Sequence, residues 1–233
     1  MKARFLALFD CDGTLIDAQN GIVRAVQAAF QVEGLPLPDA GAIRQGIGLS
    51  VEPAMARLLP EADGDLIERL TEHFRDAFLD LRMVADYHEP LYPGAEAALR
   101  ALAQAGFTLG IATGKGRRGL ALTLARNGLD DLFRYRQTAD DAPSKPAPDM
   151  ILNAMAESGV TAGRVVMIGD TSFDMAMARA ARVTAIGVAW GYHDYATLRE
   201  AGAHEIAESF EEMRHLLHAL EARSSTVAEH VAI

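Results

Sequence analysis

Two acidic residues near the start of the chain, Asp10 and Asp12, directly follow an apolar run that ends at Phe9. Side chains two positions apart on extended backbone share a face, so both carboxylates can point to the same place, and Gly13 then allows a tight turn. Two like charges this close are costly unless one is protonated or a cation lies between them, and both solutions suit a catalytic site. An ordinary Asp-Gly turn explains this short motif equally well on its own.

Four more polar side chains can reach the same place. Open parallel sheets collect ligand groups at the carboxyl ends of their strands; two of these residues follow apolar runs, and a third lies four positions after the second of them. The fourth is a lysine in the segment 144–149, where two prolines predict an extended loop and a helix is expected to start at about Asp149. Singly, each residue is explained as a helix cap, a first-turn acid or a solvated charge. The four are Thr113, Lys145, Asp170 and Asp174.

Short apolar runs predict the strands that position these residues. They alternate with segments of helical periodicity, a pattern that is typical of βαβ units and of a parallel sheet buried on both faces. The sequence therefore predicts an α/β fold with a doubly wound, Rossmann-like parallel sheet. The predicted strands cover residues 5–9, 107–112, 165–168 and 184–189.

The segment 18–89 interrupts this alternation, because it contains helical patterns but no convincing strand. Apolar residues recur there at three- and four-residue spacing over 18–33, 51–59 and 65–83. We expect an all-helical cap domain at 18–89, inserted into a core domain formed by 1–17 and 90–221, with crossings that act as a hinge. The last residues, 222–233, are small and polar and are predicted to form a flexible tail.

Composition limits the classes of partner. The 233 residues carry a formal net charge of −10, which opposes non-specific attraction to nucleic acid or anionic membranes. The chain has a single cysteine and no apolar run of about 18 residues, the length that a membrane span requires. We expect a cytoplasmic protein that binds neither nucleic acid nor membrane, and a monomer or a homodimer.

In this order, the motifs resemble those of the haloacid dehalogenase superfamily. They are Asp-x-Asp-Gly-Thr at 10–14, Thr-Gly at 113–114, Lys-Pro at 145–146 and Gly-Asp-(x)3-Asp at 169–174. The resemblance covers residues 5 to about 207, and the helical insert is similar to the cap of phosphatase and phosphomutase members. Within the insert, 44–50 is similar to the cap segment that contacts substrate, and the nearest resemblance is to phosphoglycolate phosphatase-like proteins.

The resemblance and the chemistry of the residues imply a Mg²⁺-dependent phosphatase acting on a small phosphomonoester, with 2-phosphoglycolate as the leading candidate. Asp10 would be the nucleophile that forms an aspartyl-phosphate, and Asp12 the general acid and then the general base. Mg²⁺ would bind Asp10, the main-chain carbonyl of Asp12 and Asp170, while Asp174 holds its water ligands. Thr113 and Lys145 would position the phosphoryl oxygens. Further substrate contacts are expected from Thr14, Arg44, Gly46, Gly114 and Lys115.

Other classes of protein remain open at this point. A sugar phosphomutase shares the aspartyl-phosphate, a phosphate-accepting receiver gathers similar residues without the insert, and a dehalogenase needs neither the second aspartate nor a metal. The glycines of 114–119 with Asp140 also spell a dinucleotide-binding fingerprint, which would indicate an oxidoreductase but leaves the acidic residues unexplained.

Two positions depart from the commonest form of the superfamily: Cys11, where an aromatic residue is usual, and Gly114, where an amide residue is frequent. Gly114 thereby removes a possible hydrogen-bond donor beside the phosphate. The basic residues Lys115, Arg117 and Arg118 are interpreted as a solvated helix start, although they could attract an anionic substrate.

Overall fold

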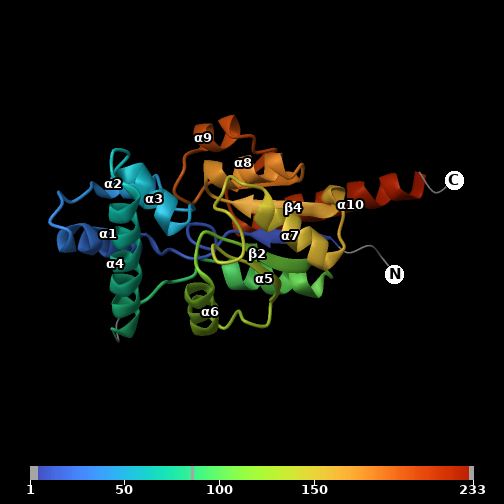
Figure 1. Cartoon of the computed structure of the whole chain (residues 1–233). Coiled ribbons are helices and arrows are strands. Elements are labelled where there is room, and N and C mark those ends of the chain that lie inside the picture. Colours follow the sequence, from blue (N-terminus) through green and yellow to red (C-terminus); the bar gives the residue numbers. More distant parts are fainter. Residues whose placement is uncertain (1–4, 85–86, 231–233) are drawn as a thin grey trace.

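A parallel sheet forms the centre of the computed structural model, which describes residues 5–84 and 87–230. In the described part of the chain the sheet has six strands in the order β3-β2-β1-β4-β5-β6, and every neighbouring pair is parallel. All four residues of β1 are buried, because helices cover both faces of the sheet (Figure 1). The strands are β1 (Leu6–Phe9), β2 (Thr108–Ala112), β3 (Phe133–Gln137), β4 (Val165–Gly169), β5 (Thr184–Val188) and β6 (Glu205–Ala207).

Alternate residues of the central strand enter two separate apolar clusters. Phe9 packs in one cluster with residues of α5, α6 and α10, and Leu8 packs in the other with residues of α7 and α8. This two-faced packing confirms the doubly wound α/β class. The helices are α5 (Ala95–Gln104), α6 (Arg117–Arg126), α7 (Asp149–Ser158), α8 (Ser172–Ala180), α9 (Tyr195–Glu200) and α10 (Phe210–His230), with a short 3-10 turn at Ala162–Arg164.

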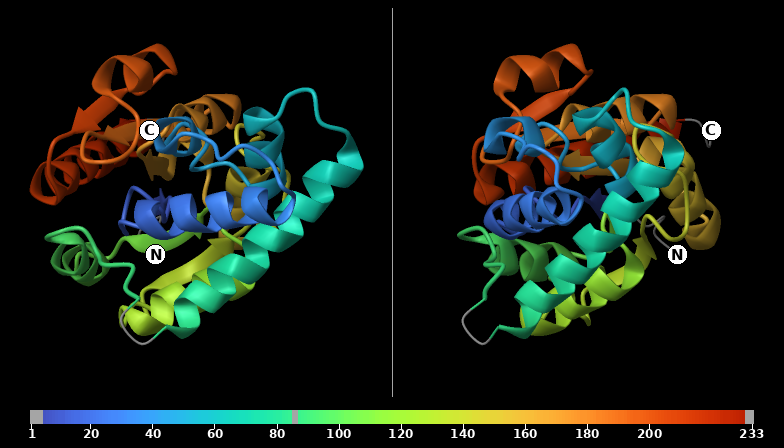
Figure 2. Two further views of the ribbon diagram at one scale, coloured as in Figure 1. Left: turned by 90° about the vertical axis from the view of Figure 1, so that its left-hand side faces the viewer. Right: turned by 60° about the vertical axis from the view of Figure 1, so that its left-hand side comes forward.

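The segment between β1 and α5 folds into helices with an apolar cluster of their own, which includes Phe30, Met55 and Leu70. These helices are α1 (Gln19–Val32), α2 (Ala40–Arg44), α3 (Val51–Leu58) and α4 (Gly64–Met83). They lie beyond one end of the sheet, and the long α4 runs across α1 (Figures 1 and 2). We refer to them as the cap and to the rest of the chain as the core.

Two backbone hydrogen bonds join the segments where the chain crosses between cap and core. The amide of Asp17 donates to the carbonyl of Pro90 at 2.9 Å, and the amide of Tyr92 donates to the carbonyl of Leu15 at 2.9 Å. The outgoing and returning segments therefore run side by side. We propose the domain boundaries expected from the sequence, near residues 17 and 90.

Several elements differ from the sequence-based expectation. β3 and β6 were not predicted, because β3 is an edge strand that carries arginines and β6 has only three residues. A flexible tail was expected at 222–233; α10 continues through 222–230, and 231–233 lie outside the described residues. The flexibility of this segment stays a prediction. Ser224 helps to anchor this part of the helix, because its hydroxyl donates to the carbonyl of Gly163 at 3.1 Å. No helix within 5–84 and 87–230 has the length and apolarity to cross a membrane.

Candidate active site

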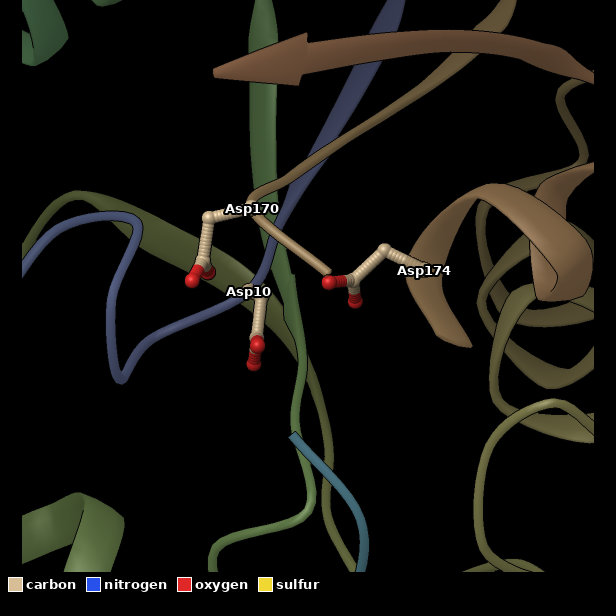
Figure 3. Close-up of side chains that lie close together, drawn as sticks. All are labelled: Asp10, Asp170 and Asp174. Atoms are coloured by element: carbon tan, nitrogen blue, oxygen red, sulfur yellow. The ribbon is translucent and has the colours of Figure 1, made fainter. Parts of the chain in front are cut away.

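The predicted acidic residues meet at the carboxyl ends of the central strands. Asp10 directly follows β1, Asp170 directly follows the neighbouring β4, and Asp174 lies in the first turn of α8 (Figure 3). One carboxylate oxygen from each residue lies within 4.8 Å of the other two, and all three residues are buried. Parallel pairing of β1 with β4 explains this convergence, because it aligns the two strand ends.

This cluster fits a divalent cation by its chemistry. Three carboxylates are the ligand type that Mg²⁺ prefers. Oδ1 of Asp10 pairs with Lys145, whereas Oδ2 has no partner within the described part of the chain. Buried oxygens without such partners are costly unless another group satisfies them. The cluster therefore has the composition of a Mg²⁺ site and one carboxylate oxygen, Asp10 Oδ2, that lacks a partner among the described residues.

The charges in the cluster are strongly coupled. Burial raises the pKa of Asp10 to about 7, with a further increase from Asp174 and an opposing effect of Lys145. Burial, then Asp174 and Asp10, raise the pKa of Asp170 well above its usual range. Burial alone would lower the pKa of Lys145, but Asp10 and Asp174 outweigh it and raise that pKa. The three buried acids share a single lysine, which contacts two of them, so a further cation would favour the ionised forms of the acids.

Lys145 lies between two of the acids. Its Nζ is 2.9 Å from Asp10 Oδ1 and 2.6 Å from Asp174 Oδ1, and its side chain is fully buried. The loop that carries Lys145 is a turn and not the extended segment predicted, because the amide of Ala147 bonds to the carbonyl of Ser144 at 3.1 Å. The turn places the ammonium group beside the nucleophile candidate.

Asp174 has two structural tasks. Its Oδ2 accepts hydrogen bonds from the amide of Thr171 at 3.0 Å and from its hydroxyl at 2.7 Å, which completes a capping box on α8. Its Oδ1 faces Lys145. The helix start thus fixes the orientation of the carboxylate toward the cluster.

Thr14 contacts Asp170 and does not line the cavity described below. Its hydroxyl donates to Asp170 Oδ1 at 2.7 Å, and the amide of Tyr192 donates to Asp170 Oδ2 at 2.9 Å. Trp190 Nε1 in turn donates to the carbonyl of Thr14 at 3.0 Å. The 190–192 segment, which follows β5, therefore orients a candidate metal ligand. In the sequence, the position of this segment directly after a predicted strand is the pattern that could indicate a role in the site. A segment that only packs against the core occupies the same position, so the pattern does not separate the two roles.

Gly114 lies where core and cap touch. A Cβ at this position would come within 2.4 Å of the carbonyl oxygen of Leu49 and 2.7 Å of that of Gly48. The amide of Ser50 also donates to the hydroxyl of Ser144 in the core at 2.9 Å. The departure from the family pattern at Gly114 thus makes room for the cap segment 46–50, next to Thr113.

The position of Lys115 differs from the one expected from the sequence. We expected a solvated helix start, but Lys115 is buried, with Nζ 3.0 Å from Asp12 Oδ1 and 3.4 Å from Glu89 Oε1. Two carboxylates compensate the burial of its charge. The expectation holds for Arg117, whose side chain is 68% exposed. Asp140 Oδ2 accepts a hydrogen bond from the amide of Arg117 at 2.7 Å, so the acidic residue of the fingerprint-like pattern stabilises the start of α6.

A cavity of about 720 Å³ lies between core and cap. Core residues that line it include Asp10, Asp12, Thr113, Gly114 and Lys115. The cap contributes the segment 46–55, including Gly46, and apolar side chains of α1 and α4 such as Val26, Phe74 and Phe78. A small molecule in this cavity would therefore contact Asp10 and Asp12 on the core side and the apolar residues of the cap on the other side.

Arg44 is placed differently from the other expected substrate contacts. The residues that line the cavity within the described part of the chain do not include Arg44. Its Nε donates to Oε1 of Gln19, at the start of α1, at 2.9 Å. Contact between Arg44 and a substrate stays a prediction.

Comparison with known proteins identifies the family of the chain. Residues 7–188 match the family model described as haloacid dehalogenase-like hydrolase. The probable phosphatase IndB of Dickeya dadantii (strain 3937) is 37% identical over 224 residues, covering 95% of this chain and 96% of that protein. The phosphoglycolate phosphatase of Chromobacterium violaceum is 33% identical over 214 residues, covering 88% and 95%. A hydrolase of Pseudomonas syringae has a similar crystal structure, with TM-score 0.82, 29% identity and coverage of 93% and 98%.

The chain belongs to the haloacid dehalogenase-like hydrolases. Within that family it is similar to phosphoglycolate phosphatases, as the order of its motifs predicted. The resemblance drawn from the sequence is thereby confirmed, and the dinucleotide-binding and receiver interpretations are not supported.

Proposed function

We propose that this hydrolase is a Mg²⁺-dependent phosphatase that cleaves a small phosphomonoester through an aspartyl-phosphate on Asp10. The observation that carries the proposal is that Asp10 lines the cavity, with Oδ1 2.9 Å from Lys145 Nζ and with Oδ2 lacking a partner among the described residues. A buried carboxylate of this kind is both a nucleophile and a metal ligand.

Mg²⁺ would be held by Asp10, the main-chain carbonyl of Asp12 and Asp170, with Asp174 bonding to its water ligands. When bound, the ion neutralises the charge that develops on the phosphoryl oxygens. Lys145 adds a fixed positive charge beside Asp10. Thr113, at the end of β2, is buried and lines the cavity, where its hydroxyl can bond to a phosphoryl oxygen.

The reaction has two balanced steps. In the first, Asp10 attacks phosphorus, the ester P–O bond breaks, and Asp12 gives its proton to the departing alkoxide. In the second, water attacks the aspartyl-phosphate, Asp12 takes a proton from that water, and inorganic phosphate and the Asp10 carboxylate are released. Asp12 lines the cavity, which allows both proton transfers.

The leading substrate candidate is 2-phosphoglycolate, supported by the names of several relatives. Recognition of its carboxylate would need a cation, and Lys115 is already paired with Asp12 and Glu89. Arg75 and Arg118 also line the cavity and could serve instead. We further propose a cytoplasmic protein, in keeping with its single, buried cysteine, Cys11, and an oligomeric state of monomer or homodimer.

The test is phosphate release from a panel of small phosphomonoesters, with and without Mg²⁺, for the wild type and for Asp10→Asn. We expect Mg²⁺-dependent release that Asp10→Asn abolishes, with 2-phosphoglycolate among the best esters. Isomerisation of a sugar phosphate without net release would indicate a mutase. Absence of release from every ester would contradict the proposed function, and halide release from a haloacid would indicate a dehalogenase.

A further inference from the structure

A buried group of charged side chains lies beside Asp12 and outside the motifs that identify the family. It consists of Lys115, Glu89 and Arg82, whose side chains are only 5%, 3% and 3% exposed. The three come from different places: the turn after β2, the returning crossing from the cap, and the last turn of cap helix α4. The network therefore joins the catalytic end of the core to the cap.

Arg82 fixes the position of Glu89. Arg82 Nε donates to Glu89 Oε2 at 3.1 Å and Nη2 donates to Oε1 at 2.9 Å, which is a bidentate pair. The hydroxyl of Thr123 on α6 donates to Glu89 Oε2 at 3.2 Å. The carboxylate is held on both oxygens, so its direction toward Lys115 is defined.

Glu89 in turn helps to orient Lys115 toward Asp12. Lys115 Nζ lies 3.4 Å from Glu89 Oε1 and 3.0 Å from Asp12 Oδ1, and it sits 5.4 Å from the centre of the Phe78 ring of α4. The ammonium group already has two carboxylate partners, so it is poorly suited to recognise a substrate carboxylate.

We propose that Lys115 is a positioning residue that holds Oδ1 of Asp12, and that Glu89 and Arg82 orient Lys115 for this task. Oδ2 of Asp12 is then the oxygen that gives a proton to the departing alkoxide and takes one from water. Because Arg82 and Phe78 belong to α4, correct seating of the cap completes the arrangement. This inference rests on the proposed phosphatase function, since it assigns a role to Asp12 within that reaction.

The leaving group of the ester separates this role from substrate binding. An alkyl phosphate needs a proton on its alkoxide, whereas p-nitrophenolate leaves as the anion, so only the second step for p-nitrophenyl phosphate requires Asp12. In Lys115→Met we expect kcat for the best alkyl phosphate to fall about 100-fold, because both proton transfers suffer. With p-nitrophenyl phosphate we expect a burst of nearly one equivalent of nitrophenolate, followed by turnover slowed about tenfold.

Two further variants keep the test decisive if Lys115→Met does not fold. Lys115→Arg should retain most of the alkyl phosphatase activity, because a cation remains beside Asp12. Glu89→Gln should give the same burst pattern with a smaller loss of kcat. The matched control is Glu96→Gln, which removes a carboxylate paired with Arg100 on the surface of α5 and should leave both substrates unaffected.

The outcomes separate this inference from the proposed function. No phosphate release by the wild type would overturn the phosphatase function, and this inference with it. If the wild type is active, a raised KM with unchanged kcat in Lys115→Met would assign Lys115 to substrate binding and overturn the positioning role. Equal loss of the nitrophenolate burst and of alkyl phosphate turnover in folded Lys115→Met or Glu89→Gln would also overturn it.

Discussion

The core and the cap contribute to the site in different ways. In the core, polar side chains at strand ends form a dense set of buried charges around Asp10, with Lys145 in contact with two acids. In the cap, the cavity is lined by the segment 46–55 and by mostly apolar residues of α1 and α4. The comparison suggests that the core determines the chemistry, and that the cap determines which molecule fits and whether the core residues are aligned.

The largest effect is expected for Lys145→Met. It leaves buried acids without their cation, so we expect the free energy of unfolding to fall by about 3 kcal/mol or more and phosphatase activity to fall at least ~10³-fold. Denaturant unfolding and phosphate release measure the two quantities. Arg100→Met, which breaks an exposed pair with Glu96, should cost less than about 1 kcal/mol and leave activity unchanged. Equal effects in the two variants would contradict the distinction drawn for the core.

Asp170→Asn separates metal binding from folding. The change relieves repulsion among buried acids, so the Mg²⁺-free variant should have a melting temperature equal to or above that of the wild type. The rise in melting temperature on adding Mg²⁺ should shrink, because affinity falls by about 10–100-fold or more. Asp131→Asn, at an exposed position, is the control. An undiminished Mg²⁺ response in Asp170→Asn would remove Asp170 from the metal site.

Gly114→Ala tests the contact between core and cap. The new Cβ would collide with the carbonyl oxygens of Gly48 and Leu49, so we expect a loss of about 1–3 kcal/mol and roughly tenfold lower kcat/KM. Gly64→Ala, at the start of α4 with no neighbouring atoms within 4 Å, should be neutral or slightly stabilising. Thermal unfolding measures the change in stability, and steady-state kinetics measure the change in kcat/KM. If Gly114→Ala changes neither quantity, the cap does not need this close approach.

The smallest effect is expected for Arg44→Ala. Because Arg44 bonds to Gln19 and does not line the cavity within the described residues, kcat/KM for different phosphomonoesters should change by no more than about threefold. Comparison of selectivity across the ester panel measures this. A reversal of selectivity would instead support the substrate contact expected from the sequence, and would mean that the cap moves when substrate binds.

The same contrast explains what the sequence could predict. The central strands and their terminal Asp10, Thr113 and Asp170 were identified because buried parallel strands give unbroken apolar runs. β3 was missed because an edge strand carries charges, and nothing local distinguishes such a strand from a loop.

The network around Lys115 could not be found by the same reasoning. Burial of Lys115 depends on Glu89, which is distant in sequence and belongs to no motif, and on Phe78 in the cap. The roles of Thr14 and Gly114 likewise became apparent only from neighbours brought close by the fold, namely Asp170 and the backbone at Gly48 and Leu49. Long-range contacts of this kind leave little signal in one sequence.

The most direct test of the account is to trap the phosphorylated enzyme. Asp12→Asn should still accept a phosphoryl group from p-nitrophenyl phosphate in the presence of Mg²⁺ but should release it slowly, because the general base is gone. Acid quenching followed by peptide mass spectrometry would locate the group. The account predicts one phosphoryl group on the peptide that contains Asp10, and none when Asp10 is also changed to Asn. A phosphoryl group on another residue would contradict the assignment of Asp10 as the nucleophile.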